Sequence, residues 1–177
     1  MKREAVLGAW LMLSTLPGAW AQSPVAAPED VEAAYLYQFG RYVDWPPELV
    51  EDSDTFEICV IGVDRLEGAL TETVAGKVIT GRRVAAKRIG EPAESSHCRI
   101  LFVSSSESAR TPEILEAISG MQVLTVGRGA DFTRLGGMIG FTSDVRRVRF
   151  VVNLAAADAV KLMLSSQLLR IAVRVDR

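Results

Sequence analysis

The sequence is poor in the residues that most catalytic and metal sites need. It contains one histidine, His97, and two cysteines in 177 residues, whereas a closed zinc site takes four ligands. The three serines at 104–106 lack the flanking glycines of a nucleophile elbow. Gly127 and Gly129 lack the third glycine of a dinucleotide fingerprint. We therefore predict no catalytic residues, no metal site and no cofactor, and interpret the chain as a protein that is not an enzyme.

Excess positive charge and long apolar runs are also missing. The chain has 20 basic and 22 acidic residues, which gives a net charge of −2 at pH 7. A protein without a basic excess is a poor ligand for the phosphate backbone, so we exclude nucleic acid as a partner. No apolar run reaches the roughly 20 residues that cross a bilayer. The folded protein is therefore predicted not to be embedded in a membrane.

The first residues have the layout of a secretory signal. Lys2 and Arg3 supply positive charge, and an apolar run covers residues 5–16. Ala19 and Ala21 then place small residues at the two positions that a signal peptidase recognises. The pattern predicts export across a bacterial inner membrane, with cleavage after Ala21 and a periplasmic location for the remainder.

Composition divides the chain into three parts. Residues 1–21 are the predicted cleaved signal peptide, and residues 22–28, which are small or polar with two prolines, are predicted to be a flexible leader. Residues 29–177 show no repeat, no low-complexity stretch and no internal boundary. That length suits one domain with its own core.

Hydrophobic patterning predicts alternating helices and strands after the leader. Helices are expected from residue 28 until Trp45-Pro46, then at 65–74, from 107 or 111 to 118, at 130–135, at 154–164 and at the start of 167–175. The end of 167–175 is expected to be extended. Strands are expected at 56–62, at 84–89 as an edge strand, and at 99–103, 122–127, 137–141 and 148–152. The predicted fold class is α/β, a three-layer αβα sandwich with a mainly parallel, doubly wound sheet and one antiparallel hairpin strand near the C-terminus.

The two cysteines lie on strands that this arrangement makes neighbours. Cys59 belongs to the first predicted buried strand and Cys98 begins the strand expected beside it. Parallel neighbours start at the same edge, so a Cα separation near the usual 5.5–6 Å is attainable. An oxidising compartment favours a disulfide between them. The alternative is a pair of buried free thiols.

Two other features each allow two interpretations. Arg128 and Arg134 follow a predicted strand and could hold an anion in the crevice at the strand ends, but most arginines are simply solvated. The first predicted helix is rich in aromatic residues, which could form a partner-binding face. Packing against the sheet is the more common role of such a stripe.

Seven segments of the sequence resemble the YfiR-like family, in order along the chain. Residues 33–46, which carry AAYLYQF and then VDWP, are similar to the opening signature of that family. The other segments are 56–62, 98–103, 123–127, 136–141, 149–154 and 165–169. The resemblance extends from residue 31 to residue 170 and therefore covers nearly all of the predicted domain.

The resemblance implies a periplasmic α/β domain that tends to dimerise. The family's namesake represses an inner-membrane diguanylate cyclase by binding its periplasmic part, which lowers cyclic di-GMP output and biofilm formation. An outer-membrane-associated partner can sequester the namesake and release the cyclase. The positions of Cys59 and Cys98 resemble one disulfide of the namesake. Its second bridge has no counterpart here, because residues 141–150 contain no cysteine.

The leading functional prediction is thus a repressor of a diguanylate cyclase that acts by protein–protein contact. The predicted contact surface is the last strand and helix, represented by Phe150, Val152, Ala157, Asp158 and Lys161, with the aromatic first helix second. The alternative is a periplasmic small-ligand sensor or solute-binding accessory protein without catalytic activity, with Arg128 and Arg134 at its site.

Overall fold

The computed structural model describes residues 26–46, 54–144 and 147–177. The predicted signal peptide and most of the predicted leader lie outside these residues. So does the turn expected at 145–146. Among the described helices, none combines the length and the apolar character that a bilayer-crossing segment needs.

An eight-stranded sheet forms the centre of the fold, in the order β10-β8-β7-β6-β5-β2-β4-β3. Its five inner strands β4, β2, β5, β6 and β7 run parallel, and β8 is antiparallel to β7. A separate two-stranded sheet pairs β1 with β9. The strands are β1 Val43–Asp44, β2 Thr55–Ile61, β3 Val78–Ile79, β4 Arg82–Ile89, β5 Cys98–Val103, β6 Leu124–Arg128, β7 Ile139–Asp144, β8 Arg147–Asn153, β9 Met163–Leu164 and β10 Arg174–Asp176.

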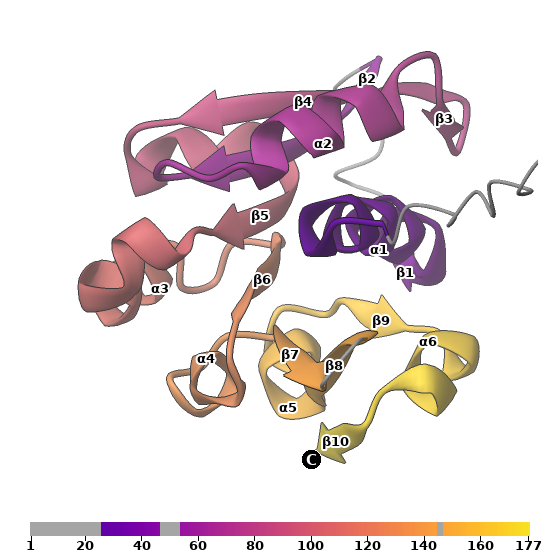
Figure 1. Ribbon diagram of the computed structural model, residues 1–177. Helices are drawn as coiled ribbons and strands as arrows, with labels where there is room; N and C mark the ends of the chain where they lie inside the picture. The colour runs from indigo at the N-terminus through magenta and orange to yellow at the C-terminus, as the bar shows by residue number, and fades with distance from the viewer. Residues whose placement is uncertain (1–25, 47–53, 145–146) are drawn as a thin grey trace, which may run out of the picture.

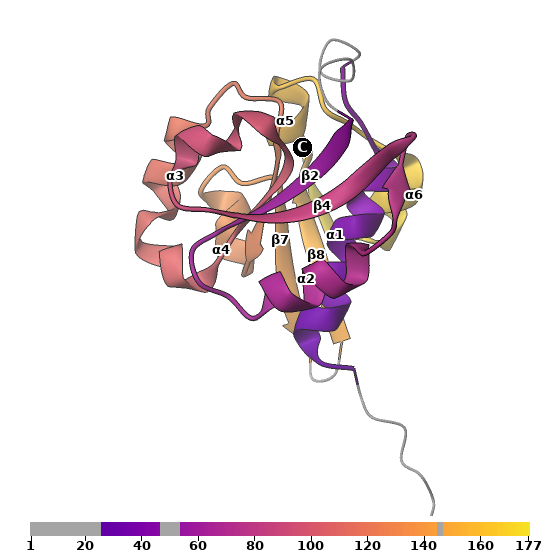
Figure 2. The ribbon, with the colours of Figure 1, turned by 90° about the horizontal axis from the view of Figure 1, so that it is seen from above.

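Helices cover both faces of this curled sheet, which confirms the predicted αβα class. Figure 2 shows α3 and α4 on one side of the sheet and α1, α2 and α6 on the other. One hydrophobic cluster joins α1, α2 and α6 to the sheet, and a second joins α3 and α4 to the opposite face. The helices are α1 Pro28–Tyr42, α2 Leu66–Val74, η2 Pro92–His97, η3 Ser105–Arg110, α3 Thr111–Ala117, α4 Ala130–Arg134, α5 Leu154–Ala159 and α6 Ser166–Ile171.

Helix α1 packs into the curl of the sheet through its aromatic stripe (Figure 1). Pro28 begins the helix, and two acidic residues in the first turn complement the helix dipole. The ring of Tyr35 lies edge-on to that of Phe150 at a centroid distance of 5.4 Å, and Phe39 stacks on Phe141 at 5.9 Å. The aromatic residues of α1 therefore form part of the core, which was the more common of the two interpretations.

Three details differ from the sequence-based expectations. The helix predicted at 154–164 ends at Ala159, and Lys161 adopts a positive φ of 60°. Residues 163–164 then form β9, which pairs with β1. Strand β4 is not the edge, because the two-residue strand β3 pairs outside it. Each difference depends on pairing between distant segments, which local periodicity does not encode.

Candidate functional site

The strand order of the sheet reverses between β2 and β5, which makes this position a topological switch point. The chain leaves β2 for β4 on one side and returns to β5 on the other. In open α/β sheets, ligands bind outside the carboxyl ends of the strands at such a switch point. The candidate site therefore lies where β2 ends at Ile61 and β5 ends at Val103.

The chain itself fills the crevice at this switch point. The backbone N–H of Ser104 donates to the carbonyl oxygen of Ile61 at 3.1 Å, and its hydroxyl donates to that of Val63 at 2.9 Å. Ser106 Oγ accepts from the N–H of Val63 at 3.0 Å. Gly62 has a φ of +91° and lies against Ser106 and Glu107, so no larger residue fits there. The serines at 104–106 thus serve to join two loops.

Beside this crevice, Arg128 at the end of β6 joins two acidic side chains. Its Nε donates to Glu32 Oε1 at 3.0 Å and its Nη2 to Glu32 Oε2 at 2.6 Å. The Nη2 also donates to Asp64 Oδ1 at 3.0 Å, and Nη1 pairs with the other oxygen of Asp64. The guanidinium lies over the ring of Phe102, 5.0 Å from its centroid. We refer to Glu32, Arg128 and Asp64 as the acidic–arginine cluster.

The charges in this cluster stabilise one another. Burial alone would lower the pKa of Arg128, but its hydrogen bonds to Asp64 and Glu32 shift the pKa above the ordinary value. Burial likewise acts to raise the pKa of Asp64, yet the hydrogen bonds from Arg128 and from the N–H of Leu66 outweigh it and lower the pKa. Arg128 and Asp64 are therefore both ionised at neutral pH.

The geometry argues against the predicted anion site at Arg128 and Arg134. The cleft here has a volume of about 340 Å³ and is lined by Glu29, Glu32 and Asp64 as well as by Arg65 and Arg128. Two carboxylates already occupy the guanidinium of Arg128, so a further anion would be repelled. Arg134 is exposed and pairs with Asp131 in α4 instead. The structure therefore does not bring the two arginines together around one ligand.

Three of the five residues of the predicted partner surface are buried. Phe150, Val152 and Ala157 are all 0% exposed, because β8 and α5 turn these side chains into the core around α1. Asp158 and Lys161 are exposed. A partner can touch this region only through the outer side of α5 and the turn that follows it.

An apolar groove lies next to that outer side. Its volume is about 330 Å³, and it runs between the end of α3 and α5. Leu115 and Ile118 form one wall, and Ala156, Ala159 and Val160 form the other. The exposed residues of α5 therefore flank a concave apolar surface, which is the arrangement that protein partners commonly use.

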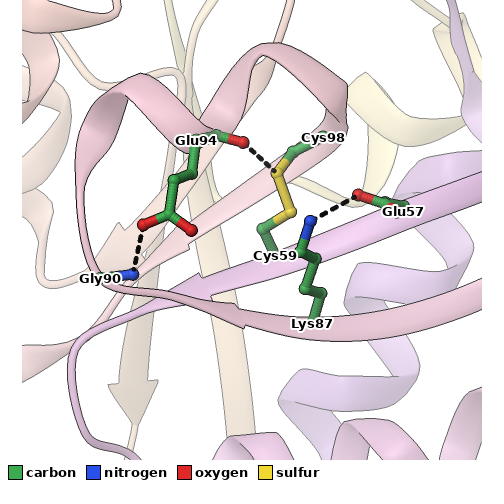
Figure 3. Close-up of a disulfide and its surroundings, with 6 residues drawn as sticks. All are labelled: Glu57, Cys59, Lys87, Gly90, Glu94 and Cys98. Atoms are coloured by element: carbon green, nitrogen blue, oxygen red, sulfur yellow. Dashed lines mark hydrogen bonds and ion pairs between the residues drawn. A yellow bond between two sulfur atoms is a disulfide. The ribbon is translucent and has the colours of Figure 1, made fainter.

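The structure confirms the disulfide between Cys59 and Cys98 (Figure 3). The Cα atoms lie 5.8 Å apart, and both residues are fully buried. Glu57 lies nearby and pairs with Lys87 at 3.7 Å. Within the described ranges, Glu57 and the two cysteines are the only group with metal-ligating atoms this close. The bridge uses both sulfur atoms, so they offer no thiolate to a metal.

The sequence analysis did not identify Glu32 and Asp64, the two carboxylates of the acidic–arginine cluster. Glu32 lies four residues before Leu36 and seven before Phe39, so helical spacing places it on the buried face of α1. A carboxylate on a buried face needs a charged partner. That spacing was the available signal, although it does not identify the partner.

The sequence as a whole matches the YfiR/HmsC-like family over residues 29–173. The chain belongs to this family. Membership supports a periplasmic regulatory role in cyclic di-GMP signalling in general, and a regulatory rather than a catalytic activity. No curated protein matches the sequence.

Two solved structures share the fold of this YfiR/HmsC-like chain. One is a conserved domain protein from Vibrio cholerae, with a TM-score of 0.61 and 10% identity. The other is an ABC domain in complex with L-Trp from Streptococcus pneumonia, with a TM-score of 0.56 and 9% identity. Each alignment covers 84% of this chain and 60% of the other. At such low identity the likeness concerns the fold alone.

Proposed function

We propose that this protein represses an inner-membrane diguanylate cyclase by binding the periplasmic part of that enzyme. The observation that carries the proposal is the family match, which covers residues 29–173. A bound repressor lowers cyclic di-GMP output only if it binds the inactive arrangement of the cyclase more tightly than the active one. We further propose that the protein is a homodimer. We also propose that an outer-membrane-associated protein ends the repression of the cyclase by sequestering the repressor.

The contact surface in this proposal is the exposed side of α5. Asp158 and Lys161 supply charge of both signs, and the apolar groove between α3 and α5 lies beside them. Charged residues around an apolar centre are typical of protein interfaces. The buried residues Phe150 and Val152 support this surface from below and do not touch the partner.

The test is a pull-down from membranes with tagged residues 22–177. We expect recovery of a diguanylate cyclase with the wild-type protein and at least about tenfold less with Asp158→Lys combined with Lys161→Glu, because charge reversal at an interface opposes association. Arg83→Glu, an exposed change on β4 far from α5, is the matched control and should retain recovery. Equal recovery with all three proteins would reject this surface, and no cyclase with any of them would reject the repressor function.

We keep a small-ligand sensor as the second candidate function, since one structural neighbour is a complex with L-Trp. That ligand belongs to the neighbour. The cleft at Arg128 does not favour an anion, so a sensor needs another site.

A further inference from the structure

The eight-stranded sheet ends in an open edge at its last strand. Strand β10 is the outermost strand beside β8, and no strand of the described residues pairs with its other side. Figure 1 shows β10 and the C-terminus at this end of the sheet, beyond β8. An edge strand offers unpaired N–H and carbonyl groups to any further strand. We refer to the outer side of residues 174–176 as the β10 edge.

The backbone of β10 directs the groups of two residues toward the open side. The strand runs parallel to β8, and the N–H of Val173 donates to the carbonyl oxygen of Phe150 at 2.9 Å. Successive residues of a strand direct their backbone groups to opposite sides, so those of Val175 also face β8. The N–H and carbonyl groups of Arg174 and Asp176 consequently face outward.

The charges along β10 are complementary to themselves. Arg174 and Asp176 lie two residues apart, so their side chains share one face of the sheet. The Nε of Arg174 lies 3.0 Å from Oδ1 of Asp176, and each side chain remains 48% exposed. If two copies pair in antiparallel fashion about Val175, Arg174 of each copy lies opposite Asp176 of the other. An in-register parallel pairing would instead place like charges side by side, which is unfavourable.

The outward backbone groups fit the same antiparallel register. Arg174 of one copy and Asp176 of the other become directly opposite residues that exchange two N–H···O bonds, and the two-fold axis repeats this pair. Val175 then lies opposite Val175 of the second copy, in a non-hydrogen-bonded position where Cα atoms approach to about 4.5 Å. Val175 is half-buried and packs against the core. Its open side would gain an apolar neighbour in the pair.

Exposed apolar side chains precede the β10 edge. Ile171 and Val173 are 56% and 59% exposed. In the antiparallel register, residue 177 of the second copy lies opposite Val173 and covers part of it. The other edge of the sheet differs, because β3 consists of only Val78 and Ile79 and carries no charge. The combination of open backbone, paired charges and exposed apolar side chains is therefore found at the β10 edge and not at β3.

We propose that the β10 edge pairs with the β10 edge of a second copy of this chain, antiparallel and centred on Val175. The two sheets then continue into each other across a two-fold axis, as in other isologous strand pairings. The occupant is a second copy because the alternation of Arg174 and Asp176 complements itself. The inference gives an interface to the homodimer of the proposed function and rests on that part of it. The interface does not use Asp158 or Lys161.

Charge reversal at the β10 edge tests the interface. Sedimentation velocity follows residues 22–177 up to about 1 mM, the weak end of specific association, and we expect a reversible monomer–dimer equilibrium. Arg174→Asp and Asp176→Arg each place like charges opposite one another twice in a dimer, so each should raise the dissociation constant at least about tenfold. The matched control is Arg83→Asp, an exposed change on β4 near the other edge, which should leave the constant unchanged.

A mixture of the two reversed chains gives the sharpest result. The Arg174→Asp chain carries acidic residues at both positions, and the Asp176→Arg chain carries basic residues at both. Antiparallel pairing between them places opposite charges at every contact. We expect the mixture to form a heterodimer of about wild-type strength, although neither chain pairs well with itself. A role of the two residues within one chain cannot produce this result, because both chains lack the internal ion pair. Unfolding midpoints establish that each chain is folded.

Three outcomes would overturn the proposal: a monomer at every concentration, a dimer that both charge reversals leave unchanged, or a mixture that does not associate. A monomeric wild type together with lost recovery of the cyclase by the Arg174→Asp chain would assign the edge to the cyclase instead. A dimer that behaves as expected, with no cyclase in the membrane pull-down, would reject the repressor function and keep the interface. The two failures are therefore distinguishable.

Discussion

The two ends of the parallel strands place arginines among different neighbours. At the carboxyl end, Arg128 donates to Glu32 and Asp64, and three charged groups form a closed set. At the amino end, Arg82 and Arg99 line one small cavity with Trp45, whose indole N–H has no acceptor among the described residues. The comparison teaches that the surroundings of an arginine are set by the side chains that distant segments bring to it.

The two ends also differ in how the chain fixes them. The disulfide joins Cys98, the first residue of β5, to β2 and so fixes the strand start next to Arg99. The carboxyl end relies on hydrogen bonds instead, through the acidic–arginine cluster and through Ser104 and Ser106. The amino end is thus fixed by a covalent bond and the carboxyl end by electrostatic interactions. Substitutions can remove the disulfide and the acidic–arginine cluster separately.

The largest expected effect is loss of the disulfide. The bridge spans 39 residues, for which loop-closure entropy predicts about 4 kcal/mol of stability. Replacing Cys59 and Cys98 together by Ala should lower the free energy of unfolding in urea by that amount. Adding a reductant to the wild-type protein should reproduce the decrease and leave the double variant unchanged. A loss below about 1 kcal/mol would show that the denatured chain is not constrained as the entropy model assumes.

The second prediction concerns the carboxyl end. Arg128→Met should lower the free energy of unfolding by about 3 kcal/mol, because it leaves two buried carboxylates without their partner. Adding Glu32→Gln should restore part of the loss, since one of those charges is then removed. The exposed Arg134→Met is the control, with a change of less than about 0.5 kcal/mol. Equal losses for Arg128→Met and Arg134→Met would mean that the cluster adds no stability.

The sheet could be predicted from the sequence because its central strands are short, nearly continuous runs of apolar residues, which are buried in the fold. All six residues of β5 are buried, and such runs are typical of parallel strands covered on both faces. The two-residue strands β1, β3 and β9 were missed, because two residues carry no periodicity. Their existence depends on partners far along the chain, such as Leu164 for Val43.

The candidate site was harder to predict for the same reason. Arg128 was recognised as a site residue, but Glu32 lies 96 residues away and Asp64 lies 64 away. The proximity of Arg82, Arg99 and Trp45 likewise arises from three separate elements. In the predicted partner surface, Phe150 and Val152 are buried, because β8 belongs to an αβα sheet whose faces are covered by helices.

The third prediction sharpens the description of the amino end. Gly40→Ala should lower the free energy of unfolding by about 2 kcal/mol, since the new methyl group presses on Ile79 and overpacks a core site. Gly68→Ala is the matched control, because an added Cβ there meets nothing within 4 Å and alanine favours the α2 helix. Equal stability of the Gly40→Ala and Gly68→Ala variants would contradict close packing of α1 against Ile79.

The smallest expected effect separates the two ends by pH. The pKa of Asp64 is lowered from 3.8 because bonds from Arg128 and Leu66 outweigh its burial. The pKa of Glu94, near the amino end, is lowered by the N–H groups of Glu91 and Gly90. A depressed pKa contributes stability above the unfolded value, and this contribution is lost as the pH falls through the folded value.

Both carboxylates should therefore make the protein less stable in acid, but to different extents. Urea unfolding at pH 5 and pH 3 should show a smaller loss on acidification in Asp64→Asn than in the wild type. Glu94→Gln should change the loss less, because Glu94 is exposed and its interactions are screened by water. If Glu94→Gln had the larger effect, acid sensitivity would arise mainly at the amino end, and electrostatic stabilisation would not be specific to the carboxyl end.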